Sequence, residues 1–192
     1  MKEDILEQLV DEYLQSKGYF TRHNIKFRPR SDHPEFQSKH DSNHSDIDVL
    51  GFNPKLEGAS RVLAVSCKSW QAGFKPDIKI AEIENNKIIN GREAWKGFRE
   101  LVVPKWAEAF RQAVFDCTGG SEFTYVTAVT VVKGNRESWE SCSAFKEVIQ
   151  SPIKILSFED ILNELYSELN TTVASSNIGR ILQLFKASGW LK

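Results

Sequence analysis

The sequence predicts an α/β protein in which one mixed β-sheet is flanked by helices. Segments rich in β-branched and aromatic residues alternate with segments whose apolar residues recur at helical spacing, which is the pattern of that class. The 192-residue chain is long enough for one domain with a substantial core. A turn-rich connection between two of the strands predicts an antiparallel hairpin within the sheet.

The first two elements are expected to be a helix and a basic strand. Apolar residues recur at helical spacing over residues 3–17, and Gly18 is a natural stop, so this segment predicts an amphipathic helix. Residues 19–30 then read as a strand that carries bases with no acid between them: Arg22, Lys26, Arg28 and Arg30. Two interpretations are open for these bases, a solvated sheet edge and a contact with a phosphate backbone.

The polar segment 31–45 is expected to be a loop. It holds three of the four histidines, which are His33, His40 and His44. Because the segment does not read as a helix, no helical pair of histidines fixes the geometry of a transition-metal site. We therefore favour a substrate-contacting loop over a histidine metal site, since loops on a rigid scaffold commonly carry recognition.

Residues 45–52 and 62–68 are expected to form the hairpin. The second strand begins as a continuous apolar run, which indicates a central position in the sheet. Asp48 lies near the entry of the first strand and Lys68 near the exit of the second, so the two side chains should meet at one end. A lysine at the end of a buried strand costs free energy unless it meets an anion, although it can also extend to solvent.

The remainder of the chain predicts further helices and two more strands. After the turn-rich linker 71–76, the expected elements are, in order, helix 77–89, a helical stretch 93–115 interrupted at Pro104, strand 123–132, helix 143–150, strand 152–158, helix 161–169 and a helical segment 175–192. Ser157 followed by Asp160 matches a helix-start signal. We expect one domain over residues 1–170, with residues 171–192 as a C-terminal helical extension packed on it.

Composition limits the function classes. The net charge of −1 provides no global basic field, so a nucleic-acid partner would have to meet a local patch. The three cysteines include no CxxC pair, which argues against a structural zinc site or a disulfide framework and for reduced thiols in the cytoplasm. The N-terminus lacks the apolar run of a signal peptide, and no apolar stretch approaches the roughly 20 residues that a membrane span needs.

The first 70 residues resemble the PD-(D/E)XK nuclease superfamily, whose pattern is an acid in the first helix, an aspartate, and then an acid or amide two residues before a lysine. Here those positions read Glu7, Asp48 and Ser66-Cys67-Lys68. The segment from Glu7 to Tyr19 is similar to the first helix of Mrr-like restriction enzymes and archaeal Holliday-junction resolvases. The resemblance implies a restriction-endonuclease-like αβββαβ core, with extra helices in residues 77–117 and at the C-terminus.

The resemblance also implies a function, namely Mg²⁺- or Mn²⁺-dependent hydrolysis of DNA phosphodiester bonds in restriction, repair or a mobile element. Its catalytic positions are Glu7, Asp48, Ser66 and Lys68, and the expected metal ligands are Asp48, Glu7, Asp46 and the carbonyl of Cys67. The expected nucleic-acid contacts are Arg22, Lys26, Arg28, Arg30, His44 and Trp70. A homodimer is compatible with this picture, and no membrane partner is expected.

Ser66 departs from the superfamily pattern, because a hydroxyl stands where a carboxylate or an amide is usual. The change removes a negative charge from the expected metal site and should weaken metal binding. An alternative is therefore a catalytically degenerate DNA-binding or protein-interaction module with the same fold.

Overall fold

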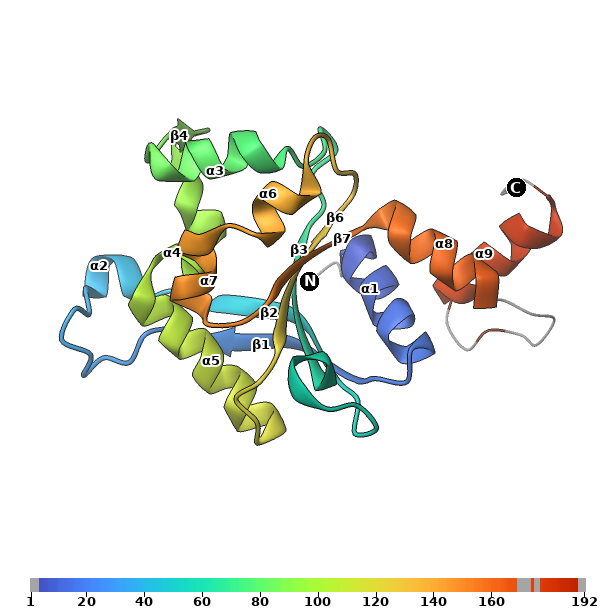
Figure 1. Ribbon diagram of the computed structural model, residues 1–192, viewed down its shortest axis with the longest axis horizontal. Helices are drawn as coiled ribbons and strands as arrows, with labels where there is room; N and C mark the ends of the chain where they lie inside the picture. Colours follow the sequence, from blue (N-terminus) through green and yellow to red (C-terminus); the bar gives the residue numbers. More distant parts are fainter. Residues whose placement is uncertain (1–3, 169–173, 175–176, 190–192) are drawn as a thin grey trace.

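A computed structural model describes residues 4–168, 174 and 177–189 (Figure 1). Its centre is a five-stranded mixed sheet with helices on both faces, which confirms the predicted α/β class. In spatial order, the strands are β1 (Phe20–Phe27), β2 (Ser45–Phe52), β3 (Val62–Lys68), β6 (Thr124–Val129) and β7 (Ile153–Ser157). The strands β1, β2 and β3 pair antiparallel, whereas β3, β6 and β7 pair parallel.

The middle position of β3 confirms what its apolar run predicts. Such a run suits a strand that is covered on both faces, and β6 beside it is buried at every position. The crossover from β3 to β6 carries three α-helices, and parallel neighbours require a long connection of this kind. The sheet is thus a rigid frame whose central strand ends at Lys68.

One face of the sheet is covered by the helices of the crossover and of the β6–β7 connection. These are α3 (Pro76–Glu84), α4 (Arg99–Val102), α5 (Pro104–Thr118), α6 (Arg136–Glu140) and α7 (Ser143–Ile149). Their core is aromatic, with edge-to-face contacts of Trp139 with Phe74, Phe98 and Phe145. Such pairs add about 0.5–1.5 kcal/mol each beyond the burial of apolar area.

The other face is covered by α1 (Ile5–Ser16) and α8 (Phe158–Glu168), and α9 (Asn177–Ala187) follows on the outer side of these helices. Leu6, Leu9 and Val10 of α1 pack on Val49 and Val65 of the sheet. The helix α9 lies against α1 and α8, and its Leu182 joins the same core. Residues 171–173, 175–176 and 190–192 of the expected extension lie outside the described residues.

The helix start predicted at Ser157 is confirmed by a reciprocal pair of hydrogen bonds. The Asp160 amide donates to the Ser157 hydroxyl at 3.1 Å, and the Ser157 amide donates to the Asp160 carboxylate at 2.8 Å. Two backbone donors at the start of α8 are satisfied in this way. Asp160 also accepts from Arg136 at 2.6 Å, which ties α8 to α6.

The predictions for residues 77–115 were wrong in detail. The helix α3 ends at Glu84, and a small hairpin of β4 (Ile88–Ile89) and β5 (Arg92–Glu93) follows before the 3₁₀ turn η2 (Ala94–Gly97). Asn86, Asn90 and Gly91 have positive φ angles, and these residue types enter that region most easily, so the chain turns where helical spacing predicted continuation. The predicted interruption at Pro104 left open two helices or one kinked helix, and the structure has two, with Pro104 at the start of α5.

Three shorter elements escaped the sequence analysis. They are α2 (Ser38–Asp41) in the polar loop, the 3₁₀ turn η1 (Gly58–Arg61) inside the hairpin connection, and α6. The side chain of Asn135 caps α6 by accepting from the Glu137 amide at 3.0 Å. In the part of the chain that the structure describes, no helix combines the length and the apolar character that crossing a membrane would require.

Candidate functional site

The strands β2 and β3 separate at one end, and Asp48 lies at the point of separation. Their backbone ladder ends with the pair Val49 and Val65. Beyond that pair, the Cys67 amide donates to Asp48 Oδ2 at 2.6 Å, so the Asp48 side chain serves as the acceptor in place of a backbone carbonyl. This bond holds a half-buried carboxylate at the open end of the sheet.

Lys68 lies at the same end, as the sequence predicted. Its Nζ donates to the Ser66 hydroxyl at 2.7 Å and lies 5.3 Å from the centroid of the Phe98 ring. Its charge also acts on Asp48. The ammonium is therefore held among a carboxylate, a hydroxyl and an aromatic face instead of extending freely into solvent.

The N-terminus of α1 is tied to this end of β3. Asp4 caps α1 by accepting from the Leu6 amide at 2.8 Å, and it also accepts from the Ser69 hydroxyl at 2.5 Å. Glu7, in the first turn of α1, is thereby brought beside Cys67. Burial, followed by the charges of Asp48 and Glu7, raises the pKa of the Cys67 thiol well above its ordinary value.

Acidic groups outnumber the nearby bases at this end of the sheet. Burial raises the pKa of Asp48, and Lys68 and the Cys67 amide only partly offset that effect. The charges of Glu100 and Asp46 raise the pKa further, so it lies above its ordinary value. The ionised form of Asp48 is therefore disfavoured here, and a further positive charge beside it would stabilise it.

The donors present suit a hard cation. Asp48, Glu7, Asp46 and the Cys67 carbonyl offer oxygen atoms, which Mg²⁺ and Mn²⁺ prefer, while the protonated Cys67 thiol is a poor ligand. Asp46 is exposed and lies two residues before Asp48 on the same strand. Among the described residues, no group of three or more His, Cys, Asp or Glu side chains is arranged to hold a metal ion.

Two buried residues that the sequence analysis missed lie behind Ser66. The Tyr125 hydroxyl donates to Glu100 Oε1 at 2.5 Å, and the nearby Ser66 hydroxyl acts to lower the pKa of the phenol. Burial, together with Glu100, raises the pKa of Tyr125 well above its ordinary value. No sequence pattern marks Glu100, because its place depends on the short helix α4, which the continuous helical spacing concealed.

The expected nucleic-acid contacts fall into separate places. Lys26, Arg28, Arg30 and His44 line a cavity of about 500 Å³ between β1 and α5, together with His33, Lys105, Glu108 and Asp116. Arg22 lies apart from this cavity, with its Nη1 3.5 Å from the Cys117 sulfur. Trp70 is 37% exposed, but its ring packs on Phe74 and Phe98, and the Lys79 ammonium lies 4.9 Å from its centroid.

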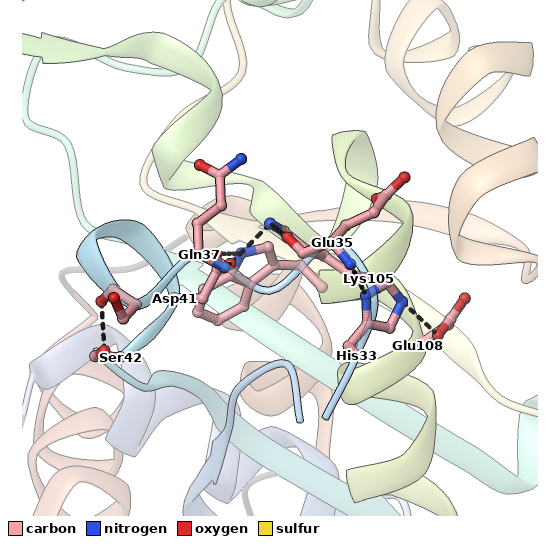
Figure 2. Close-up of polar contacts among 9 residues, drawn as sticks. His33, Glu35, Gln37, Asp41, Ser42, Lys105 and Glu108 are labelled. Atoms are coloured by element: carbon pink, nitrogen blue, oxygen red, sulfur yellow. Dashed lines mark hydrogen bonds and ion pairs between the residues drawn. The ribbon is translucent and has the colours of Figure 1, made fainter. Parts of the chain in front are cut away.

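The polar loop before β2 is fixed to α5 by a buried ion pair (Figure 2). Lys105 Nζ lies 2.7 Å from Asp41 Oδ2 and donates to the Glu35 carbonyl at 2.8 Å. The Trp106 ring nitrogen and the Gln37 amide also donate to Asp41, at 3.1 and 2.8 Å. The loop is therefore an ordered wall of the basic cavity.

One histidine of this loop has protein partners at both ring nitrogens. His33 Nδ1 accepts from the Glu35 amide at 3.1 Å, and its Nε2 lies 3.5 Å from Glu108 (Figure 2). His44 lines the cavity, and His40 is exposed on α2.

No family model matches the chain, and neither the curated proteins nor the solved structures contain a significant match.

We predict that Asp48→Asn raises the free energy of unfolding at pH 7. The folded-state pKa of Asp48 is raised, so folding must accommodate an unfavourable charge at neutral pH, and the amide retains an oxygen for the Cys67 N–H. In the wild type, the folded state binds the proton of Asp48 more tightly than the unfolded state does. The stability gained by the substitution therefore shrinks as pH falls through the folded pKa towards the ordinary value of about 3.9. Urea unfolding at pH 7 and pH 4 measures both effects.

The control for that experiment is Asp46→Asn on the exposed neighbour, which should change the urea midpoint much less. An Asp48→Asn protein that is less stable than the wild type at pH 7 would show that the ionised carboxylate is a net source of stability.

We predict that Asp41→Asn destabilises the protein by about 3–5 kcal/mol at pH 7, because it leaves Lys105 buried without its counter-charge. Burial opposes ionisation of Asp41, but the bonds from Lys105 and Gln37 outweigh it and hold the pKa below its ordinary value. The stabilising effect is therefore complete above a pH of about 3.9 and is lost as pH falls through the folded pKa.

Urea unfolding over this pH range checks the prediction, with Asp32→Asn in the exposed Arg30 pair as the matched control. Equal effects of the two substitutions at pH 7 would contradict it.

Proposed function

We propose that this protein is a metal-dependent endonuclease that hydrolyses DNA phosphodiester bonds, with a role in restriction, repair or a mobile element. The observation that supports the proposal is the meeting of Asp48 and Lys68 at the open end of β2 and β3, with Glu7 brought beside them by α1. This is the arrangement that the resemblance to the PD-(D/E)XK superfamily implies.

Each group has a chemical task in this proposal. Asp48, Glu7, Asp46 and the Cys67 carbonyl would hold Mg²⁺ or Mn²⁺, and the ion would lower the pKa of the attacking water and offset phosphate charge. Lys68 donates hydrogen bonds to the phosphoryl oxygens, where negative charge increases during attack. The bond from Lys68 to Ser66 fixes the ammonium before the substrate arrives.

The basic cavity supports DNA as the substrate. Lys26 is the direct partner of Asp46 in the β1–β2 register, so the cavity begins beside the proposed metal site. Arg28 and Arg30 continue it along the edge of the sheet, where the Arg28 guanidinium donates to the Ser42 carbonyl at 3.3 Å. A phosphate backbone that lies along this edge would reach Asp48 and Lys68.

A second candidate function is a DNA-binding module of the same fold without catalysis. It is favoured by the hydroxyl at Ser66 and by the lack, among residues 4–168, 174 and 177–189, of a three-member group arranged to hold a metal. Both candidates bind DNA, so the cleavage assay distinguishes them.

We predict that the wild type cleaves plasmid DNA with Mg²⁺ or Mn²⁺, and that Lys68→Ala lowers the rate about 100-fold or more, since it removes charge stabilisation in the transition state. Asp48→Asn and Glu7→Gln should lower it as well. Lys55→Ala, in the connection that follows β2, is the matched control and should cleave at the wild-type rate. Equal cleavage by the wild type and Lys68→Ala would overturn the assignment of the site.

We predict that Lys26→Ala and Arg28→Ala each weaken DNA binding and reduce the salt dependence of the affinity by about one unit of slope, because each removes about one phosphate contact. Fluorescence anisotropy with a labelled duplex at several salt concentrations measures the slope. Lys154→Ala, on the far edge strand β7, should leave it unchanged. A slope unaffected by Lys26→Ala and Arg28→Ala would place the DNA on another face.

A further inference from the structure

We propose that Glu100 is a positioning residue that holds the Lys68 ammonium in place through a buried hydrogen-bonded chain formed by Tyr125 and Ser66. The inference rests on the proposed function, in which Lys68 acts on the scissile phosphate. It assigns a task to a carboxylate and a phenol that belong neither to the expected catalytic set nor to the expected metal ligands.

The chain is excluded from solvent. Lys68 Nζ lies 2.7 Å from Ser66 Oγ, and Tyr125 OH lies 2.5 Å from Glu100 Oε1. Ser66 is close enough to the phenol to act on its pKa, and this contact joins the two bonded pairs. Ser66, Tyr125 and Glu100 are 4%, 0% and 5% exposed. The parallel pairing of β3 and β6 places Ala64 opposite Tyr125, so Ser66, two residues on, shares the sheet face of the phenol.

The hydrogen bonds run in one direction. An ammonium can only donate, so Ser66 Oγ accepts from Lys68 and its own proton is available for Tyr125. The Ser66 contact lowers the pKa of Tyr125 against the larger upward effects, as expected when a hydroxyl donates to the phenol oxygen. Tyr125 then donates to Glu100, whose ionised carboxylate can only accept. The cation at the Lys68 end and the carboxylate at the Glu100 end therefore favour the same direction for the hydrogen bonds between them.

The consequence is a single position for Lys68. The Lys68 ammonium donates a hydrogen bond to Ser66 and lies 5.3 Å from the centroid of the Phe98 ring. The Asp48 carboxylate also acts on it electrostatically. A lysine side chain otherwise loses rotamer entropy when it is fixed. Because the chain fixes Ser66 and Tyr125 before substrate binds, the ordering of Lys68 need not occur in the transition state.

Tyr125→Phe and Glu100→Gln test the proposal. Each should lower the single-turnover rate about 10- to 100-fold, which corresponds to the loss of a charge-assisted hydrogen bond, while KM for duplex DNA changes less than about twofold. Glu100→Asp, which keeps the charge, should recover part of the rate.

The matched control is Thr127→Val on the same strand, the cross-strand neighbour of Ser66, which removes the buried hydrogen bond from the Trp139 ring nitrogen at 3.0 Å and none of the bonds of the chain. It should leave the rate unchanged. A wild-type rate in Tyr125→Phe, or equal losses in Tyr125→Phe and Thr127→Val, would overturn the proposal.

A second readout separates this inference from the proposed function. Nitrogen-15 NMR of the lysine ammonium groups should show a slowly exchanging Lys68 signal, identified by its loss in Lys68→Arg, that disappears in Tyr125→Phe and Ser66→Ala. If the wild type cleaves no DNA with Mg²⁺ or Mn²⁺, the proposed function fails, and this signal still decides whether the chain holds Lys68. An unchanged signal in both folded variants would overturn the inference.

Discussion

The hydrogen bond from the Cys67 amide to the Asp48 carboxylate is the interaction on which the rest of the site depends. The ladder between β2 and β3 has ended at this point, so without this bond the Cys67 amide would need water or another acceptor. The bond links the two strands where they separate and holds the Asp48 carboxylate at a fixed position. The other groups of the site lie around that opening. Lys68 is on β3, the strand of Cys67, and the cap of α1 holds Glu7 at the same end.

The surroundings of Asp48 make its ionised form unfavourable in the folded protein. Burial raises the pKa of Asp48, and the charges of Glu100 and Asp46 add to that effect while Lys68 opposes it. A divalent cation or a set of donors on a substrate complex would relieve this effect. Local instability of this kind is common at functional sites, where the same groups that bind a ligand repel each other without it.

Local patterns predicted the frame of the protein well because the frame follows from burial. The apolar run of β3 gave its central position, and Ser157 with Asp160 gave the start of α8. The sequence predicted that Asp48 and Lys68 meet at one end of the hairpin, because the position of a residue along a strand follows directly from its place in the sequence. Glu100 was not found, since its position depends on the turn and short helix that follow the β4–β5 hairpin, and spacing alone does not reveal where a helix breaks.

The order of charges on β1 and β2 connects the basic cavity with the proposed metal site. Lys26 pairs with Asp46, and Asp48 follows two residues later on the same strand, so positive and negative groups occupy successive positions of neighbouring strands. The buried Asp41–Lys105 pair fixes the loop that forms the outer wall of the basic cavity. A polyanion bound along Arg28 and Lys26 would then meet the acidic end of the sheet with one of its phosphates. In the proposed complex, contacts of these bases with neighbouring phosphates would supply the attraction that a net charge of −1 does not supply at long range.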